Sequence, residues 1–289
     1  MNNRHVVMSV HYLARALLLG CFAFFIVHLV RTEHLNLYIA GRMQLIVKLS
    51  ALAMYAIAAQ QLYASFRNWS DGGVHDSSCD CGHEMPATWG RSLLLYGWFA
   101  LPLLIGFTVP DGLLGSDLAT AKGVQFAPQQ LVKPLESTVA ADLLFPSDAF
   151  TEVYAEYGKQ LVKRPIVQVT DKRFIETLTT LDLYRTAFIG KTITLSGFVY
   201  REGSMESRQF AVGRFAISCC SADASPYGIM AKFDKANTLE TDDWVAVTGT
   251  LGLASYNGIE IIQIDVSNAV KIEPPKEPYV SPDLDFGME

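Results

Sequence analysis

The sequence predicts an α-helical transmembrane anchor of about three helices, followed by a soluble α+β domain with an OB-like five-stranded β-barrel. Two observations predict this class. Apolar residues concentrate in region 1–110, and only 18% of all residues are charged, whereas soluble domains carry about 25%. The carboxyl half instead alternates apolar and polar residues between turns that contain glycine, which is typical of short strands. We therefore expect a membrane region and a soluble region in one chain.

The membrane region, 1–110, contains three apolar runs, at about 12–30, 43–65 and 92–110. Each run approaches the ~20 residues that a helix needs to cross the hydrocarbon core of a bilayer. Because backbone amides find no water there, such runs form helices, whose amides bond within the segment. The runs predict a multi-pass protein of the cell membrane that is in contact with the lipid bilayer.

The first apolar run has two other interpretations. Arg4 and Arg15 precede it as in a signal peptide, but no small-residue cleavage site follows, and further apolar runs come after it. Segment 18–21 resembles a lipoprotein cleavage box, yet Arg15 leaves only five residues before Cys21, which is too short for the apolar core of such a signal. We therefore interpret the run as a membrane helix.

The orientation of the anchor depends on basic residues near the ends of the runs, which are almost evenly divided. An inside amino end is favoured by Arg4, Arg15, Arg67 and Arg91. The reverse is favoured by Arg31, Arg42, Lys122 and Lys133. We expect the amino end inside the cell and, after three crossings, an extracytoplasmic soluble domain.

Lys48 is the charged residue inside the second apolar run. Its side chain could extend toward the membrane surface, as long basic side chains do near helix ends. Alternatively, an ionisable residue at this depth contacts a partner membrane subunit or lines a transport path. Both interpretations make Lys48 a candidate contact of the membrane or of a partner.

The loop at 70–90 lies between the second and third runs and contains donors for soft metal ions. These donors are His75, Cys79, Cys81 and His83, with carboxylates among them. Imidazole nitrogens and thiolates suit zinc and similar ions. Because the spacing H-x3-C-x-C-x-H differs from that of standard zinc fingers, we expect a flexible, low-affinity metal-collecting loop. The alternative is a solvated polar loop without a metal.

Beyond the membrane region we expect a linker, a soluble OB-like domain and an acidic tail, at 111–146, 147–280 and 281–289. The linker shows no clear periodicity and contains glycines and prolines, which predicts an extended connection. The soluble domain is expected to begin with helices from Ser147 and from Asp171, with a short strand at 165–169 between them. The apolar residues that share one face of the second helix are Phe174, Leu178 and Leu181.

Five further strands are expected at 191–200, 210–220, 227–233, 243–251 and 258–266. The segments 190–197 and 243–249 match the first and fourth strands of an OB-fold. Five short strands within about 80 residues fit a small Greek-key barrel, and an SH3-like barrel or an open sandwich is the alternative. OB barrels often bind single-stranded nucleic acid. The net charge of −6 and the membrane tether oppose such a role, so we expect no nucleic-acid partner.

The adjacent Cys219 and Cys220, with Asp223 nearby, form the densest chemical group of the soluble domain. In a regular strand the two thiols would face opposite sides. They could bind one ion only if a turn breaks the alternation, and segment 221–228 with Pro226 offers such a turn. Three interpretations stay open: a core cysteine, a soft-metal site with Asp223 as third donor, or a redox pair. Zinc or another soft divalent ion is the first metal candidate.

The segments 190–201, 214–228 and 278–280 resemble the YcgQ-type family of two-component permease subunits. The resemblance covers nearly the whole chain, and its most specific motif, C-C-x-A-D-A, places Cys219, Cys220 and Asp223 at the family's positions. It implies an accessory subunit, while a separate multi-spanning YcgR-like membrane protein forms the transport path. The loop at 70–90 departs from many metal-collecting loops because it holds fewer histidines.

The leading hypothesis for function is an accessory membrane subunit of a permease that captures or senses a zinc-like ion. The alternatives are a membrane-tethered module that binds the permease without metal, and a thiol-redox protein. We expect no enzyme, because the sequence contains no C-x-x-C motif, nucleophile elbow or phosphate loop.

Overall fold

The computed structural model describes residues 3–70, 89–126 and 144–288, which form two compact units. The helical unit comprises Met1–Leu35 and Gly41–Gly112. The soluble unit comprises Asn36–Ala40 and Leu113–Glu289. The middle of the short connection between the first two long helices therefore belongs to the soluble unit.

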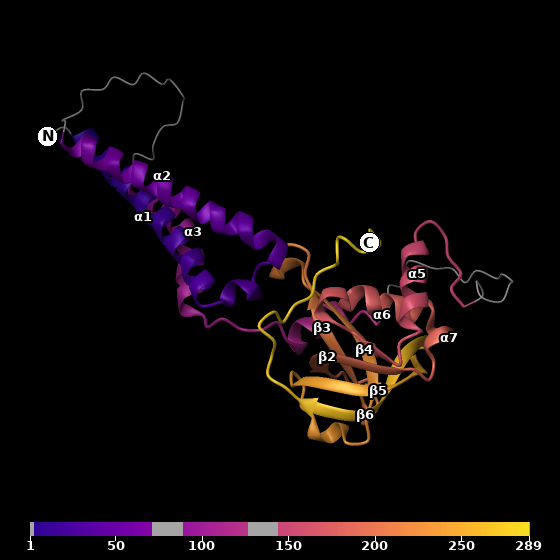
Figure 1. The fold of residues 1–289 in the computed structure, drawn as a ribbon. Helices are drawn as coiled ribbons and strands as arrows, with labels where there is room; N and C mark the ends of the chain where they lie inside the picture. Colours follow the sequence, from indigo (N-terminus) through magenta and orange to yellow (C-terminus); the bar gives the residue numbers. More distant parts are fainter. Residues whose placement is uncertain (1–2, 71–88, 127–143, 289) are drawn as a thin grey trace. The chain divides into compact units, whose positions relative to one another are not determined.

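The helical unit contains three long helices, which are α1 (Asn3–Arg31), α2 (Gln44–Ser70) and α3 (Trp89–Thr108) (Figure 1). The segments that are long and apolar enough to cross a membrane are Val6–Arg31, Gly41–Ser70 and Gly90–Thr108. Each of them overlaps with one of the three apolar runs of the sequence, and the first two extend five to six residues beyond their run at one end. The predicted anchor of three apolar helices is thus confirmed.

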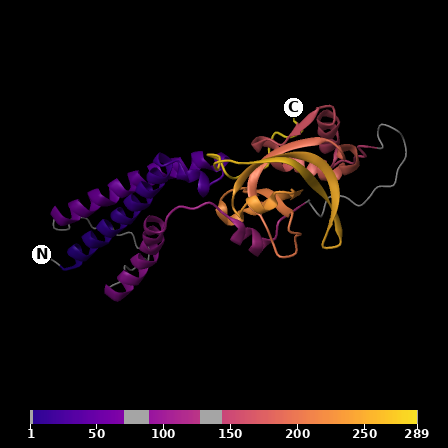
Figure 2. The same ribbon diagram turned by 90° about the horizontal axis from the view of Figure 1, so that it is seen from below.

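Helices α1 and α2 pack closely on each other, whereas α3 packs more loosely and mainly on α1 (Figure 1 and Figure 2). Most of the buried residues of α1 and α2 are small, and they include Ala16, Ala23, Ala51 and Ala58. Small residues allow two membrane helices to approach closely. Large apolar side chains such as Leu45 and Trp98 instead point outward and are 66% and 68% exposed. This apolar exterior suits a lipid environment, because soluble proteins rarely expose such large apolar surfaces.

The soluble unit is built on a six-stranded sheet. Its strands are β1 (Ile166–Gln168), β2 (Thr192–Tyr200), β3 (Gln209–Ala216), β4 (Ser225–Lys232), β5 (Trp244–Tyr256) and β6 (Ile259–Lys271). The order is β1-β2-β3-β4-β6-β5, and β2 also pairs with β5, so five strands close into a ring (Figure 2). Strands β4 and β6 of this ring run parallel. This arrangement is compatible with the predicted OB-like fold.

Helix α6 (Phe174–Leu183) packs on the sheet and is buried over most of its length (Figure 1). Phe174, Leu178 and Leu181 are buried in one core with ring residues such as Ile193 and Val247, as the apolar face of the sequence predicted. The neighbouring helices are α5 (Glu152–Leu161), which packs on α6, and α7 (Arg185–Phe188), which follows it. Helix α6 thus buries its apolar face against the ring instead of exposing it to solvent.

The first part of the expected linker folds into the soluble unit. A short helix, α4 (Ser116–Lys122), lies in this part, and its Ala119 is fully buried. Asp242 holds the start of α4, because its Oδ1 accepts the Ser116 N–H at 2.7 Å and its Oδ2 accepts the Ser116 hydroxyl at 2.8 Å. The remaining linker residues, 127–143, lie outside the described residues.

Candidate functional site

The double-cysteine loop, residues 217–224, follows β3. Because β3 ends at Ala216, Cys219 does not continue the strand, contrary to the strand expected as far as position 220. The two oxygens of Asp223 accept backbone N–H groups, Oδ1 that of Ser218 at 2.9 Å and Oδ2 that of Cys219 at 2.7 Å. Side-chain bonds of this kind compete with strand pairing. They explain why the alternation of the sequence breaks at the cysteines.

The loop brings the two thiols close together. Cys219 Sγ and Cys220 Sγ are 3.6 Å apart, and the exposure of Cys219 opposes its interpretation as a core cysteine. Two thiolates on one tetrahedral zinc ion lie about 3.8 Å apart, given Zn–S bonds of about 2.3 Å. The pair therefore fits two positions of a soft-metal site. Among the described residues, however, no group of three or more His, Cys, Asp or Glu side chains is arranged to hold a metal ion.

The electrostatics of the loop favour the protonated form of the Cys219 thiol. Its hydrogen bond with the Asp223 carboxylate, and then that with the Cys220 thiol, raise the pKa of Cys219 to about 11. Because the thiolate is the nucleophile and the metal ligand, this thiol is a poor nucleophile at neutral pH unless a cation displaces its proton. The local charge thus disfavours the thiol-redox interpretation.

Backbone hydrogen bonds join the double-cysteine loop to the connection between α1 and α2, Asn36–Ala40. The Ala40 N–H donates to the Cys219 carbonyl at 3.0 Å, and the Ser221 N–H donates to the Tyr38 carbonyl at 2.8 Å. A change in backbone geometry at the cysteines would therefore act directly on this connecting segment. Nothing in the sequence pattern pointed to this contact, because its partners lie far apart along the chain.

The other predicted site residues lie outside this loop. The structure does not describe the metal donors predicted in the loop between α2 and α3, which are His75, Cys79, Cys81 and His83. Lys48 is exposed near the start of α2, and its Nζ lies 3.5 Å from Oε1 of Gln44, the first residue of this helix. This direction agrees with a side chain that extends toward the membrane surface. The metal-collecting loop and a partner contact of Lys48 stay predictions.

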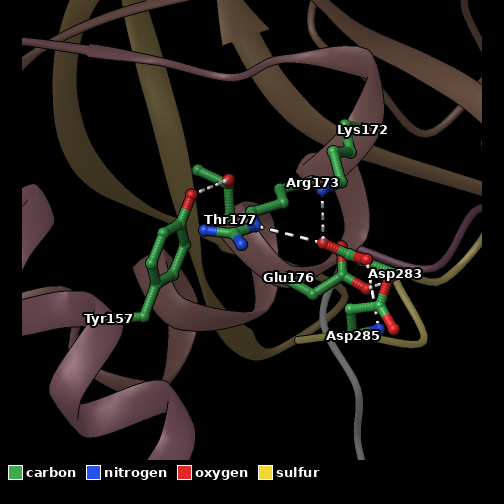
Figure 3. A network of polar contacts seen from close by, with 7 residues as sticks. All are labelled: Tyr157, Lys172, Arg173, Glu176, Thr177, Asp283 and Asp285. Carbon is green, nitrogen blue, oxygen red and sulfur yellow. Dashed lines mark hydrogen bonds and ion pairs between the residues drawn. The ribbon is translucent and has the colours of Figure 1, made fainter. Parts of the chain in front are cut away.

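A polar network holds the C-terminal tail on the helices of the soluble unit (Figure 3). Arg173 donates from Nε to Asp283 Oδ2 at 3.1 Å, and the Asp283 N–H donates to Glu176 Oε1 at 2.8 Å. The Arg173 guanidinium also lies 5.8 Å from the ring centroid of Phe286. The acidic tail predicted at 281–289 is therefore packed on the domain, over the part of it that the structure describes.

Glu176 is a buried carboxyl group within this network. It is 4% exposed, and its Oε2 has no hydrogen-bond partner among the described residues. Burial raises the pKa of Glu176 above its usual 4.5, although the Asp283 N–H acts in the opposite direction. At pH values between the unfolded and the folded pKa, the Glu176 carboxyl group is therefore protonated in the folded state and ionised in the unfolded chain. The stability contributed by this group is complete below about pH 4.5 and is lost as the pH rises through the folded pKa.

Replacing Glu176 with glutamine should raise the free energy of unfolding at pH 8, and the gain should disappear as the pH falls toward 4.5. The amide removes the charge that burial penalises, while its oxygen can still accept the Asp283 N–H. Urea unfolding of the detergent-solubilised chain at several pH values, followed by circular dichroism, measures the difference. Glu156→Gln, at an exposed carboxylate of α5, is the matched control without such a gain. A gain in unfolding free energy that grows toward acid pH would mean that folding does not raise the pKa of Glu176.

Arg214 of β3 is a buried charge whose role the sequence did not reveal. Its side chain is 0% exposed, and its Nη1 donates to Asp171 Oδ1 at 2.8 Å. Its Nε and Nη2 donate to the carbonyls of Pro278 and Glu277 at 3.0 and 2.8 Å. The guanidinium lies 5.1 Å from the ring centroid of Trp244. An arginine among the apolar residues of a predicted strand was the available signal.

Comparisons with known proteins cover both units. A model of the DUF1980 N-terminal domain matches residues 14–125, and a model of the DUF1980 C-terminal domain matches residues 144–282. The UPF0703 protein YcgQ of Bacillus subtilis is 26% identical over 281 residues, which are 92% of this chain and 98% of the relative. A Streptococcus mutans protein named "Putative two-component membrane permease complex subunit" is 25% identical over 198 residues, 63% of this chain and 70% of the relative. The chain thus contains both DUF1980 domains and is a homologue of the YcgQ-type proteins, which confirms the predicted family.

Proposed function

We propose that this protein is the accessory subunit of a two-component membrane permease complex and that it performs no chemical reaction itself. Three apolar helices support its membrane location, and the Streptococcus mutans relative is named as a subunit of such a complex. The loose packing of α3 is the observation that supports an accessory role most directly. It leaves helix faces within the membrane region for a second membrane protein.

The partner in this proposal is a multi-spanning, YcgR-like membrane protein that forms the transport path. Co-expression of the tagged full chain with such a protein, followed by purification in a mild detergent, tests the assignment. We expect the two proteins to purify together in a fixed ratio. An unrelated tagged protein with three membrane helices is the control and should retain no partner. If the tagged chain retains no more than this control, the accessory role is wrong.

We further propose that all three helices cross the membrane and that the soluble unit is extracytoplasmic. Asn36–Ala40 and Leu113, which follow α1 and α3, both belong to the soluble unit. Within the helical unit, His34 Nδ1 and Asp111 Oδ2 are 2.6 Å apart, so the ends of α1 and α3 meet. These contacts are those expected if α1 and α3 cross in one direction and α2 returns. A fusion of alkaline phosphatase to the carboxyl end should be active, whereas an inactive fusion at normal expression would reverse the orientation.

Binding of a soft divalent ion, with zinc as the first candidate, is a second proposed property. The thiols of Cys219 and Cys220 would supply two ligands, and Asp223 would supply the third once it exchanges its backbone hydrogen bonds for the ion. The 3.6 Å separation of the two sulfur atoms supports this proposal. The binding of Asp223 to two N–H groups opposes it, so we expect moderate affinity.

The double change Cys219→Ser/Cys220→Ser should lower the zinc affinity of the detergent-solubilised chain at least tenfold, because serine hydroxyls are poor ligands for zinc. Calorimetric titration measures this change. The matched variant Cys79→Ser/Cys81→Ser separates the contribution of the loop at 70–90. An affinity that the change at 219 and 220 leaves untouched would remove the metal role of these cysteines.

A further inference from the structure

An apolar groove lies between α1, α2 and α3 of the helical unit, and the charged Arg15 belongs to its lining. It has a volume of about 520 Å³, and its lining is apolar except for Arg15, Gln61 and Tyr96. The exposed Arg15 has no ion pair or hydrogen bond among the residues that the structure describes. Oε1 of Gln61 is buried and likewise lacks a partner there. Because this oxygen is buried, Arg15 is the unpaired polar group of the groove lining that is exposed, among the residues that the structure describes.

Contacts between α1 and α3 give the depth of Arg15 in the helical unit. His11 Nδ1 and Tyr96 Oη are 2.9 Å apart, and Phe25 meets Phe107 further along both helices, so α1 and α3 run in the same direction. Tyr96 lies about 10 Å from the start of α3, and Arg15 lies about 6 Å beyond His11, at 1.5 Å per residue. Arg15 of α1 thus lies level with a point about 16 Å from the start of α3, whose 20 residues span about 30 Å, the thickness of the hydrocarbon core.

A charged side chain near the middle of a bilayer is costly, and it usually pairs with another group. Lipid headgroups carry anions, but they lie at the membrane surface, about 15 Å from this depth. A carboxylate on another membrane helix can reach the middle of the bilayer. Charge and depth together therefore favour a protein partner over a lipid.

We propose that the groove receives a membrane helix of the permease partner and that an acidic side chain of this helix pairs with Arg15. A guanidinium and a carboxylate can form two parallel hydrogen bonds, which fix the orientation of the partner helix. This inference rests on the proposed function, because it names the contact by which the accessory subunit holds its partner.

The test compares variants of the full chain that are co-expressed with the multi-spanning partner. We expect Arg15→Leu to reduce the co-purified partner at least tenfold, and Arg15→Lys to retain part of it because the positive charge remains. Arg91→Leu, in the first turn of α3 and outside the groove, should behave like the unaltered chain. In the Arg15→Glu variant, changing one membrane acid of the partner to arginine should restore the complex. Gel filtration of each variant in detergent confirms that the helical unit is intact.

The outcomes separate this inference from the proposed function. If the unaltered chain retains no partner, the proposed function fails. If it retains the partner and Arg15→Leu retains it equally well, the function stands and the inference is overturned. If Arg15→Leu loses bound anionic phospholipid, measured by mass spectrometry, but keeps the partner, the groove is a lipid site and the inference is overturned as well.

Discussion

Replacing Arg214 with leucine is expected to lower the free energy of unfolding of the soluble unit by about 3 kcal/mol. The guanidinium is fully buried and donates to the carbonyls of Glu277 and Pro278, which lose their donors in the variant. Asp171 loses its ion-pair partner too, but its side chain is 60% exposed and water can solvate it. Most of the loss therefore comes from the two carbonyl groups and from the contact with Trp244.

Urea unfolding of the detergent-solubilised chain measures this loss. The matched control is Arg208→Leu, which removes an arginine whose ion pair with Asp234 is exposed to solvent. Exposed ion pairs contribute at most about 1 kcal/mol, so the control should change stability little. If both arginine variants lose the same small amount of unfolding free energy, the buried contacts of Arg214 do not stabilise the fold as expected.

Replacing Gly249 with alanine should destabilise the ring by at least about 2 kcal/mol. A Cβ atom at this position would overlap the Asp265 carbonyl oxygen, and it would lie 2.6 Å from Ile264 Cγ2 and 2.8 Å from Val266 Cα. These atoms belong mainly to the backbone of β6, so relief requires that strand to move. Gly249 also pairs with Ile193 of β2, at the place where the ring closes.

Gly252→Ala provides a control in the same strand. A Cβ atom there would lie 3.6 Å from its nearest neighbour, Asp265 Oδ2, which is an ordinary contact. The alanine should therefore change stability little, and unfolding in urea reports both variants. Equal losses at the two positions would mean that the close approach of β6 to Gly249 does not cause the effect.

The helical unit shows how much a local pattern can predict. Three apolar runs predicted α1, α2 and α3, although α1 begins nine residues before the expected run and α2 ends five residues after it. The runs are recognisable because a segment in lipid must be apolar and must bond its own amides. The same pattern did not reveal that Arg15 lies deep along α1. Its depth depends on where Tyr96 and Phe107 of α3 meet α1, which no local pattern encodes.

The candidate site shows a similar division. Cys219, Cys220 and Asp223 were identified from sequence, because soft-metal donors are uncommon at such short spacing. The strand expected through position 220 was wrong, because Asp223 binds two backbone N–H groups that would otherwise continue the pairing. The contact of this loop with Ala40 was also missed, since it joins distant parts of the chain.

By itself the sequence determined the three apolar helices, the five ring strands and the apolar face of α6, because each depends on the local pattern of apolar and polar side chains. Only the tertiary structure decided the closure of β2 on β5, the buried position of Arg214 and the packing of Phe286 in the tail on the helices. Each of these results from contacts between segments that lie far apart in the chain. Their free energy depends on geometry that exists only after folding.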